Sequence, residues 1–125
     1  MFEITINGTV YKLKFGIGFV REVSGRRQVM LEHGTKEDVG LEYVIAKIQE
    51  GDILTLADVL ELGNKYAGEP RLTRPVIEGY LEDESTDIER LFDDVMDFFG
   101  KSNAMKKKTR AIKEATEAAE KAQQK

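Results

Sequence analysis

Side chains that could perform catalysis or hold a metal are few and scattered in this sequence. His33 is the single histidine of the 125 residues, it lies beside Gly34 in an expected loop, and the chain contains no cysteine. A metal site needs several imidazole, thiolate or carboxylate ligands at suitable spacing, and none accompanies His33. No serine has an evident histidine partner, and no pair of carboxylates lies in an apolar setting. The sequence therefore predicts a protein that is not an enzyme and that uses no cofactor and no metal.

The segment Gly16-Ile17-Gly18 matches only the beginning of a phosphate-binding glycine motif. In the pattern G-x-G-x-x-G the third glycine allows close packing of the helix, and here Arg21 occupies that position. A turn between a strand and a helix explains these glycines better.

Four acidic residues, Glu82-Asp83-Glu84 and Asp87, lie close together before an expected helix. They lack the alternating ligand order and the distal glutamate of a calcium-binding loop. Acidic residues near a helix N-terminus are also stabilised by the helix dipole. Helix capping is the preferred interpretation, and weak cation binding is the alternative.

The charge of the chain changes sign near residue 100. Residues 76–100 contain one basic and nine acidic residues, whereas residues 101–125 have a net charge of +5. Lys106-Lys107-Lys108-Thr109-Arg110 concentrates four bases that could contact nucleic-acid phosphates. However, the run has no aromatic residue on which bases could stack, and it follows a strongly acidic segment. We therefore expect a solvated tail, with nucleic-acid binding as the alternative.

The clearest local signal is the hairpin pattern FEITINGTVYKLKF, residues 2–15. Asn7-Gly8 suits the two positive-φ positions of a type I′ turn. A two-residue turn sets the register and places three pairs on one face: Phe2 with Leu13, Ile4 with Tyr11, and Ile6 with Thr9. An isolated two-stranded hairpin is only marginally stable in water, so this one must dock on helices or on another subunit.

Everything after this hairpin is expected to be helical, which makes the fold class α+β, mostly α, with a compact bundle of about five helices. Apolar residues recur at helical spacing in five segments: 19–23, 35–51, 55–68, 75–81 and 88–99. Thr35 is expected to open the second segment, and Thr55 the third, in which Tyr66 points inward. Thr86-Asp87-Ile88-Glu89 resembles a capping box for the last helix, and Gly100 is expected to end it.

The final residues, 101–125, differ in composition from the rest. Five alanines form a stripe at helical spacing: Ala111, Ala115, Ala118, Ala119 and Ala122. Alanine favours the helix but buries little apolar area, so packing should hold such a helix only weakly. We predict two parts, a hairpin plus helical domain at 1–100 and a basic tail at 101–125 that is frayed or stabilised by a partner.

The opening segment resembles the N-termini of tail assembly chaperones from long-tailed, siphovirus-type bacteriophages of Gram-positive hosts. The shared pattern is an apolar residue before Ile-Asn-Gly, then x-x-Tyr-x-Leu/Phe-x-Phe, and then a helix that begins with aromatic and basic residues. Eight residues carry it here: Ile4, Ile6, Asn7, Gly8, Tyr11, Leu13, Phe15 and Phe19. The resemblance extends over about residues 1–100.

The resemblance implies a small, non-enzymatic protein that coats the aggregation-prone tape-measure protein and helps to recruit tail-tube subunits. It also implies a homo-oligomer in the host cytoplasm that is absent from the mature virion. Many such phages append a second domain by a programmed frameshift, and the codons of Lys106-Lys107-Lys108 are a candidate slippage site. Two alternatives are a nucleic-acid-associated protein that uses the basic tail, and a structural or adaptor component of the virion.

Residues for partner binding or self-association are predicted from the apolar pattern, because the family motif identifies none. The seven candidates are Phe2, Ile4, Tyr11, Leu13, Tyr66, Tyr80 and Phe98. Phe98 lies off the main apolar stripe, so it either widens the buried face, which is preferred, or stays exposed for a partner. No apolar run approaches the roughly 18 residues of a membrane-spanning helix, so no membrane association is expected.

Overall fold

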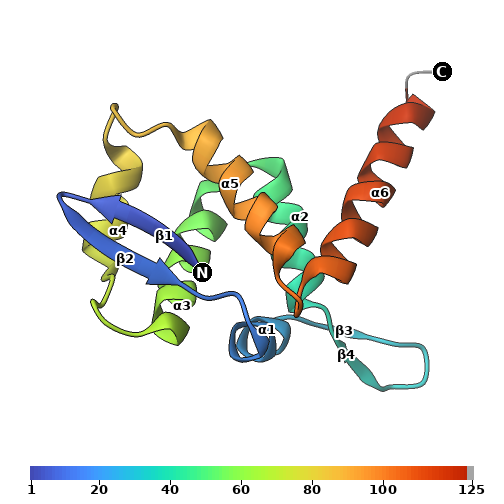
Figure 1. Ribbon diagram of the computed structural model, residues 1–125. Helices are drawn as coiled ribbons and strands as arrows, with labels where there is room; N and C mark the ends of the chain where they lie inside the picture. The colour runs from blue at the N-terminus through green and yellow to red at the C-terminus, as the bar shows by residue number, and fades with distance from the viewer. Residues whose placement is uncertain (124–125) are drawn as a thin grey trace.

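The computed structural model describes residues 1–123 and has the predicted fold class, α+β and mostly helical. It begins with a hairpin (β1, Phe2–Ile6; β2, Thr9–Leu13), helix α1 (Ile17–Ser24) and a second hairpin (β3, Gln28–Met30; β4, Lys36–Asp38). The later helices are α2 (Gly40–Glu50), α3 (Ile53–Ala67), α4 (Arg74–Glu82), α5 (Ile88–Lys101) and α6 (Lys106–Gln123). Figure 1 shows the first hairpin at one side of the helices, and the second hairpin and α6 extending from the other.

The first hairpin has the predicted register. Phe2 pairs with Leu13, Ile4 with Tyr11, and Asn7 in the turn has a φ of 51°. The alternate side chains of β1 that start at Phe2 are buried, and the others are exposed. The turn chemistry and the apolar alternation therefore select the same pairing, as expected.

The first hairpin docks on helix α3 of its own chain. The Lys14 backbone N–H donates to the Gly63 carbonyl at 2.9 Å, and the Asn64 Nδ2 donates to the Lys12 carbonyl at 3.1 Å. A Cβ atom at Gly63 would lie 2.7 Å from the Phe15 ring, so only glycine allows this approach. The helix on which the first hairpin was predicted to dock therefore belongs to the same chain.

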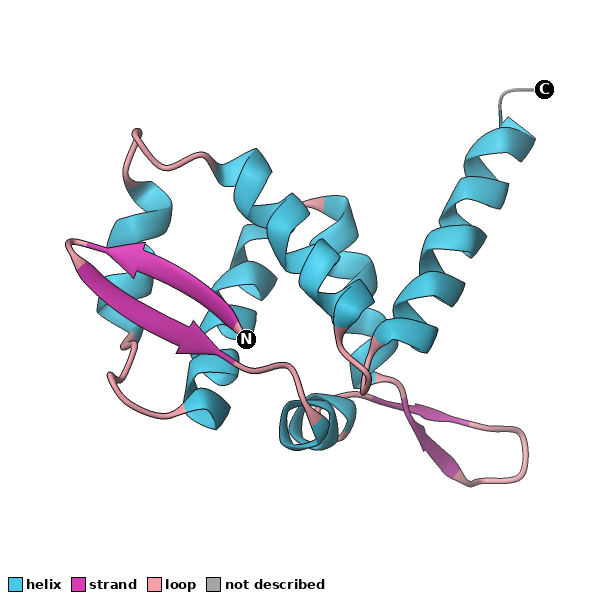
Figure 2. Ribbon diagram, viewed as in Figure 1, coloured by secondary structure: helices cyan, strands magenta, loops and turns pink. Residues whose placement is uncertain are grey.

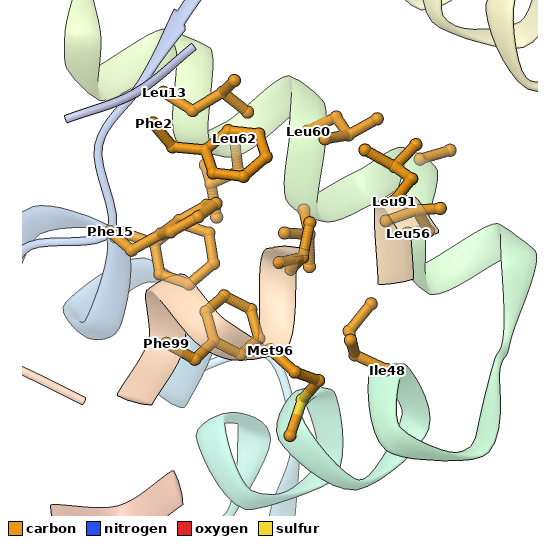
Figure 3. Packing of buried hydrophobic residues seen from close by; sticks show 14 of the residues in the cluster. Phe2, Leu13, Phe15, Ile48, Leu56, Leu60, Leu62, Leu91, Met96 and Phe99 are labelled. Carbon is orange, nitrogen blue, oxygen red and sulfur yellow. The ribbon is translucent and has the colours of Figure 1, made fainter. Parts of the chain in front are cut away.

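The core lies between the first hairpin and helices α1, α2, α3 and α5, with aromatic and aliphatic side chains meeting at its centre (Figure 3). The predicted stripe of α5 supplies Leu91, Val95, Met96 and Phe99, all of them buried. Burying each such side chain contributes roughly 1.5–3 kcal/mol. This apolar face of α5 therefore contributes much of the packing energy, and Figure 2 shows that the fold around it is mostly helical.

Two helices have an aspartate as their N-cap residue in place of the predicted threonine. Asp52 caps α3 by accepting from the Thr55 backbone N–H at 3.0 Å, so Thr55 lies inside the helix and does not open it. Asp87 caps α5 by accepting from the Arg90 N–H at 3.1 Å. The prediction of a capping box at Thr86 was therefore wrong, because Asp87 caps the helix. The helix does start at the expected place.

Helix ends follow the sequence prediction in two cases and depart from it in one. Gly51 has a φ of 86° and ends α2, and Gly68 has a φ of 101° and ends α3. Helix α5 continues through Gly100 to Lys101, because Gly100 has a helical conformation there. Its cap is Ser102, whose hydroxyl donates to the Phe15 carbonyl and ties the end of α5 to the segment after β2.

The second hairpin contradicts the prediction that everything after residue 15 is helical. Strands β3 and β4 pair antiparallel, with Val29 opposite Glu37, and α2 begins only at Gly40 rather than at Thr35. The two strands have three residues each and lack a buried face, so they show no two-residue alternation. His33 and Gly34 lie in the turn between them, as the expected loop required.

The C-terminal segment is a helix whose first half packs on the body. Met105 and Thr109 are buried, Ile112 is half-buried, and α6 contacts α2 and α5. The predicted alanine stripe is exposed along the described helix, so α6 packs through a different face. Thr109 is the buried residue of the described helix, so the expectation that packing holds α6 only weakly stays a prediction; Gln124 and Lys125 lie outside the described residues.

Candidate partner-binding groove

An open groove of about 810 Å³ runs between the N-terminal strand and the turn that follows α5. Its walls come from the start of β1, residues 13–19, the end of α3 and residues 98–104. We call it the Ile17 groove, after the apolar residue at its edge. Ile17 is 63% exposed and Met1 is 68% exposed, so two large apolar side chains stand at the surface here.

Aromatic rings form the floor of the Ile17 groove. The Phe2 and Phe98 rings meet edge to face with centroids 4.7 Å apart, and Phe15 meets Phe99 in the same way at 5.0 Å. Edge-to-face pairs are worth about 0.5–1.5 kcal/mol beyond the apolar area that they bury. Phe2, Phe15 and Phe99 belong to the hydrophobic core, so the floor is continuous with it (Figure 3).

The rim of the Ile17 groove is basic. Of the described residues that line it, those with charged side chains are Lys14 and Lys101. Lys101 Nζ lies 5.9 Å from the centre of the Phe98 ring and 3.7 Å from an Asp97 carboxylate oxygen. An apolar floor with a cationic rim suits an apolar polypeptide segment that carries acidic residues.

Tyr66 forms one wall of the groove because Gly18 leaves room for its ring. A Cβ atom at Gly18 would lie 2.6 Å from that ring. Gly16 caps α1, so both glycines serve the junction of β2 and α1, which confirms the predicted strand-to-helix turn. The prediction that Tyr66 points inward was wrong: it is 36% exposed, and its hydroxyl donates to Glu22 at 2.8 Å.

Glu22 anchors this wall through three partners. Its carboxylate accepts from Lys65 at 2.7 Å, from Tyr66 at 2.8 Å and from Arg26 at 2.8 Å. These hydrogen bonds, with that of Lys65 the largest cause, lower the pKa of Glu22 from 4.5 to about 2. The hydrogen bond between Tyr66 and Glu22 raises the pKa of Tyr66, because the hydroxyl gives up its proton less readily while it donates to a carboxylate.

The Glu22 network predicts a loss of stability in acid. A carboxyl group with a lowered folded-state pKa stabilises the protein above pH 4.5, and this contribution disappears as the pH falls from about 4.5 to about 2. Because the side chain is 28% exposed and screened by water, we expect a contribution of only about 1 kcal/mol. Urea unfolding at pH 7 and at pH 3 gives the free energy of unfolding that is lost in acid. This loss should be smaller for Glu22→Gln and for Lys65→Met than for the original chain. Equal acid effects in all three proteins would contradict this role.

The structure brings four of the seven predicted partner residues to the Ile17 groove: Phe2, Leu13, Tyr66 and Phe98. Phe2 is 5% exposed and Leu13 is fully buried, so both act as floor, whereas Tyr66 and half-buried Phe98 remain accessible. Phe98 therefore widens the buried face, as preferred, and still reaches the groove.

The other three predicted residues lie elsewhere. Ile4 is 7% exposed and belongs to the core, while Tyr11 is half-buried against it. Tyr80 is half-buried on α4, and burial raises its pKa. A role of these three in self-association remains a prediction.

The sequence pattern did not indicate Ile17, Met1 or the two rim lysines as partner-binding residues. Ile17 sits between two glycines, which made it look like a turn residue and not part of a surface. Lys14 and Lys101 are 87 positions apart in the sequence, and only the fold places them on one rim. Their common feature is spatial, so no sequence periodicity could have found them.

The residues singled out for other chemistry have structural roles. Asp87 caps α5, as predicted, whereas Asp83 lies at the end of α4 and accepts from the Ser85 N–H at 2.9 Å. Within residues 1–123, no three histidine or acidic side chains are grouped so that they could hold a metal ion. Over the same part of the chain, no helix combines the length and apolar character needed to cross a membrane.

Comparison with protein families identifies the family of this chain. The family model described as "Phage tail assembly chaperone protein, TAC" matches residues 3–114. The chain belongs to the phage tail assembly chaperone family. Neither the search of curated proteins nor the search of solved structures found a match.

Membership in the tail assembly chaperone family fits the Ile17 groove, which offers apolar surface to a partner. Chaperones of this family are generally non-enzymatic. The family match extends from β1 into α6, past the predicted boundary at residue 100. The packed start of α6 accords with this, and the boundary itself remains a prediction.

Proposed function

We propose that this tail assembly chaperone binds and solubilises the tape-measure protein by holding its apolar segments in the Ile17 groove. The observation that carries the proposal is the combination of exposed Ile17 and Met1 with a preformed aromatic floor. A floor that is already ordered spares the entropy of arranging it when a segment binds. The basic rim then favours segments in which acidic residues flank the apolar ones.

We further propose that the chain helps to recruit tail-tube subunits, self-associates, and acts without enzymatic chemistry. In this view it works in the host cytoplasm and is absent from the mature virion. The phage would be of the long-tailed siphovirus type and would infect a Gram-positive host, on the basis of the N-terminal resemblance. Mass spectrometry of purified virions tests the transient role, because stoichiometric amounts of the chain in particles would contradict it.

Co-expression with the tape-measure protein of the same phage tests client binding. We expect the long protein to move from the insoluble to the soluble fraction when the chaperone is present, and to be recovered in complex with it. If the tape-measure protein stays insoluble, or is equally soluble alone, the proposed function is wrong.

Ile17→Asp is expected to weaken client binding about tenfold, which corresponds to about 1.4 kcal/mol. The change places a carboxylate at the apolar edge of the groove, where a bound segment would cover it. Leu54→Asp is a matched control, because Leu54 is 70% exposed and does not line this groove. Affinity for a fluorescent apolar tape-measure peptide, titrated with each variant, gives the comparison. An equal loss of peptide affinity in both variants would mean that the groove is not the binding surface.

A further inference from the structure

The second hairpin is exposed over its whole length. Each residue from 25 to 38 is exposed, and the apolar Val29, Met30 and Leu31 are 44%, 65% and 45% exposed. The hairpin extends away from the helices (Figure 1). Two-stranded hairpins become stable in water when further strands or a helix cover them. An extended hairpin with three exposed apolar residues on one strand is suited to pairing with another chain.

The two edges of this hairpin differ in how well they are protected. Strand β4 consists of Lys36, Glu37 and Asp38, and charged edge strands resist pairing with other chains. Strand β3 consists of Gln28, Val29 and Met30 and carries no charge. The open edge is therefore that of β3.

The backbone of β3 presents donors and acceptors at this open edge. The Val39 N–H donates to the Arg27 carbonyl, and the Leu31 N–H donates to the Thr35 carbonyl, so residues 27 and 31 face β4. In an antiparallel ladder every second residue faces the same neighbour, which assigns Val29 to β4 as well. The N–H and C=O groups of Gln28 and Met30 therefore point to the outer edge.

We propose that β3 pairs antiparallel with β3 of a second copy of this chain, with Val29 opposite Val29 of that copy. In this register Gln28 lies opposite Met30 of the second copy, so the outward backbone groups of both strands meet each other. The two hairpins then form one four-stranded sheet about a two-fold axis.

The side chains support this register and this partner. Val29 and Leu31 share one face of the strand, so pairing joins them with the same two residues of the second copy in one apolar stripe. The strand follows the basic Arg26 and Arg27 and ends at the acidic Glu32. Antiparallel pairing brings the acidic end of each copy to the basic end of the other, whereas parallel pairing would align like charges.

This inference rests on the proposed self-association and is independent of client binding in the Ile17 groove. The experiment uses the full chain and two opposite charges at one position. Because Val29 faces itself across the axis, V29K or V29E alone sets like charges against each other. We expect the dimer dissociation constant, measured by sedimentation velocity, to rise about tenfold or more in each variant. An equimolar mixture of V29K and V29E should restore association to near the original level, because opposite charges then meet.

Met30→Pro provides a second test with a matched control. The change removes an N–H that points to the open edge and leaves the pairs at residues 29 and 31 intact. Lys36→Pro makes the same change on the other edge and should not alter the dimer. The inference is overturned if the original chain is a monomer at several hundred micromolar, which also removes the proposed self-association. The pairing through β3 is overturned, and self-association is not, if the chain associates but V29K, V29E and Met30→Pro associate equally well. The same holds if mixing the charged variants does not restore association.

Discussion

Replacing Gly40 with alanine is expected to destabilise the protein by about 3 kcal/mol, near the upper end for overpacked sites. A Cβ atom at this position would lie 1.9 Å from the Val23 carbonyl oxygen and 2.9 Å from that of Ser24. Both obstacles are backbone atoms at the end of α1, so no side-chain rotation relieves the clash. The junction of α1 and α2 would have to open, and Val23 and Leu41, buried beside it, would lose contacts.

Gly79→Ala is the matched control for Gly40→Ala. Gly79 lies inside α4, and a Cβ atom there would meet no atom within 4 Å. Alanine favours the helix over glycine by up to about 1 kcal/mol, so this variant should be as stable as the original chain or more stable. Urea unfolding followed by circular dichroism measures both. A Gly40→Ala protein that unfolds at the original urea concentration would show that α1 and α2 are not packed this closely.

Replacing Asn64 with leucine is also expected to destabilise the protein by about 3 kcal/mol. The Asn64 amide is 2% exposed, and it donates to the carbonyls of Lys12 at 3.1 Å and Pro70 at 3.0 Å. Its oxygen accepts from the Leu72 N–H at 2.7 Å. Leucine has a similar size but would leave these three backbone groups without a partner, and each such loss costs about 1–3 kcal/mol. The first hairpin and the loop before α4 would loosen together.

The control for Asn64→Leu is Asn103→Leu, at an exposed position in the turn after α5. This change should alter stability by no more than about 0.5 kcal/mol. Hydrogen exchange gives a second measurement, since Asn64→Leu should speed exchange at Leu72 and in β2 more than in α2. Uniform acceleration throughout the chain would contradict the local role of the amide.

The first hairpin could be predicted from the sequence because two independent signals agree. The turn residues Asn7 and Gly8 and the alternation of β1 each select the same register, and the structure has it. The stripe of α5 was predictable for the same reason, since one face of a long helix carries the core residues. Regular burial leaves a regular pattern in the sequence.

The second hairpin had no such pattern. Its strands are exposed on both faces, so neither burial nor alternation marks them, and Thr35 with the following acids resembles a helix start. The packing of α6 was missed for a related reason. Met105 and Ile112 are separated by charged residues, and only the position of α2 and α5 buries Met105 and half-buries Ile112.

The Ile17 groove could be predicted only in part. The aromatic residues Phe2, Tyr66 and Phe98 were recognisable as candidates, because large apolar side chains that gather at a surface mark interaction sites. Their grouping depends on segments that the fold brings together from both ends of the chain. Tyr66 faces the groove because Gly18 makes room and Glu22 holds its hydroxyl, and neither contact is visible in helical spacing.

The hydrogen bond from Ser102 to Phe15 and the contact of Phe2 with Phe98 have a consequence for the timing of folding. Chains are synthesised from the N-terminus at about 5–20 residues per second. The first hairpin leaves the ribosome early, yet Phe98 follows Phe2 by 96 positions and Ser102 follows Phe15 by 87. Phe2 and Phe15 therefore lack these two contacts until Phe98 and Ser102 have emerged. During its own synthesis this chaperone exposes apolar surface of the kind that we propose it shields in its client.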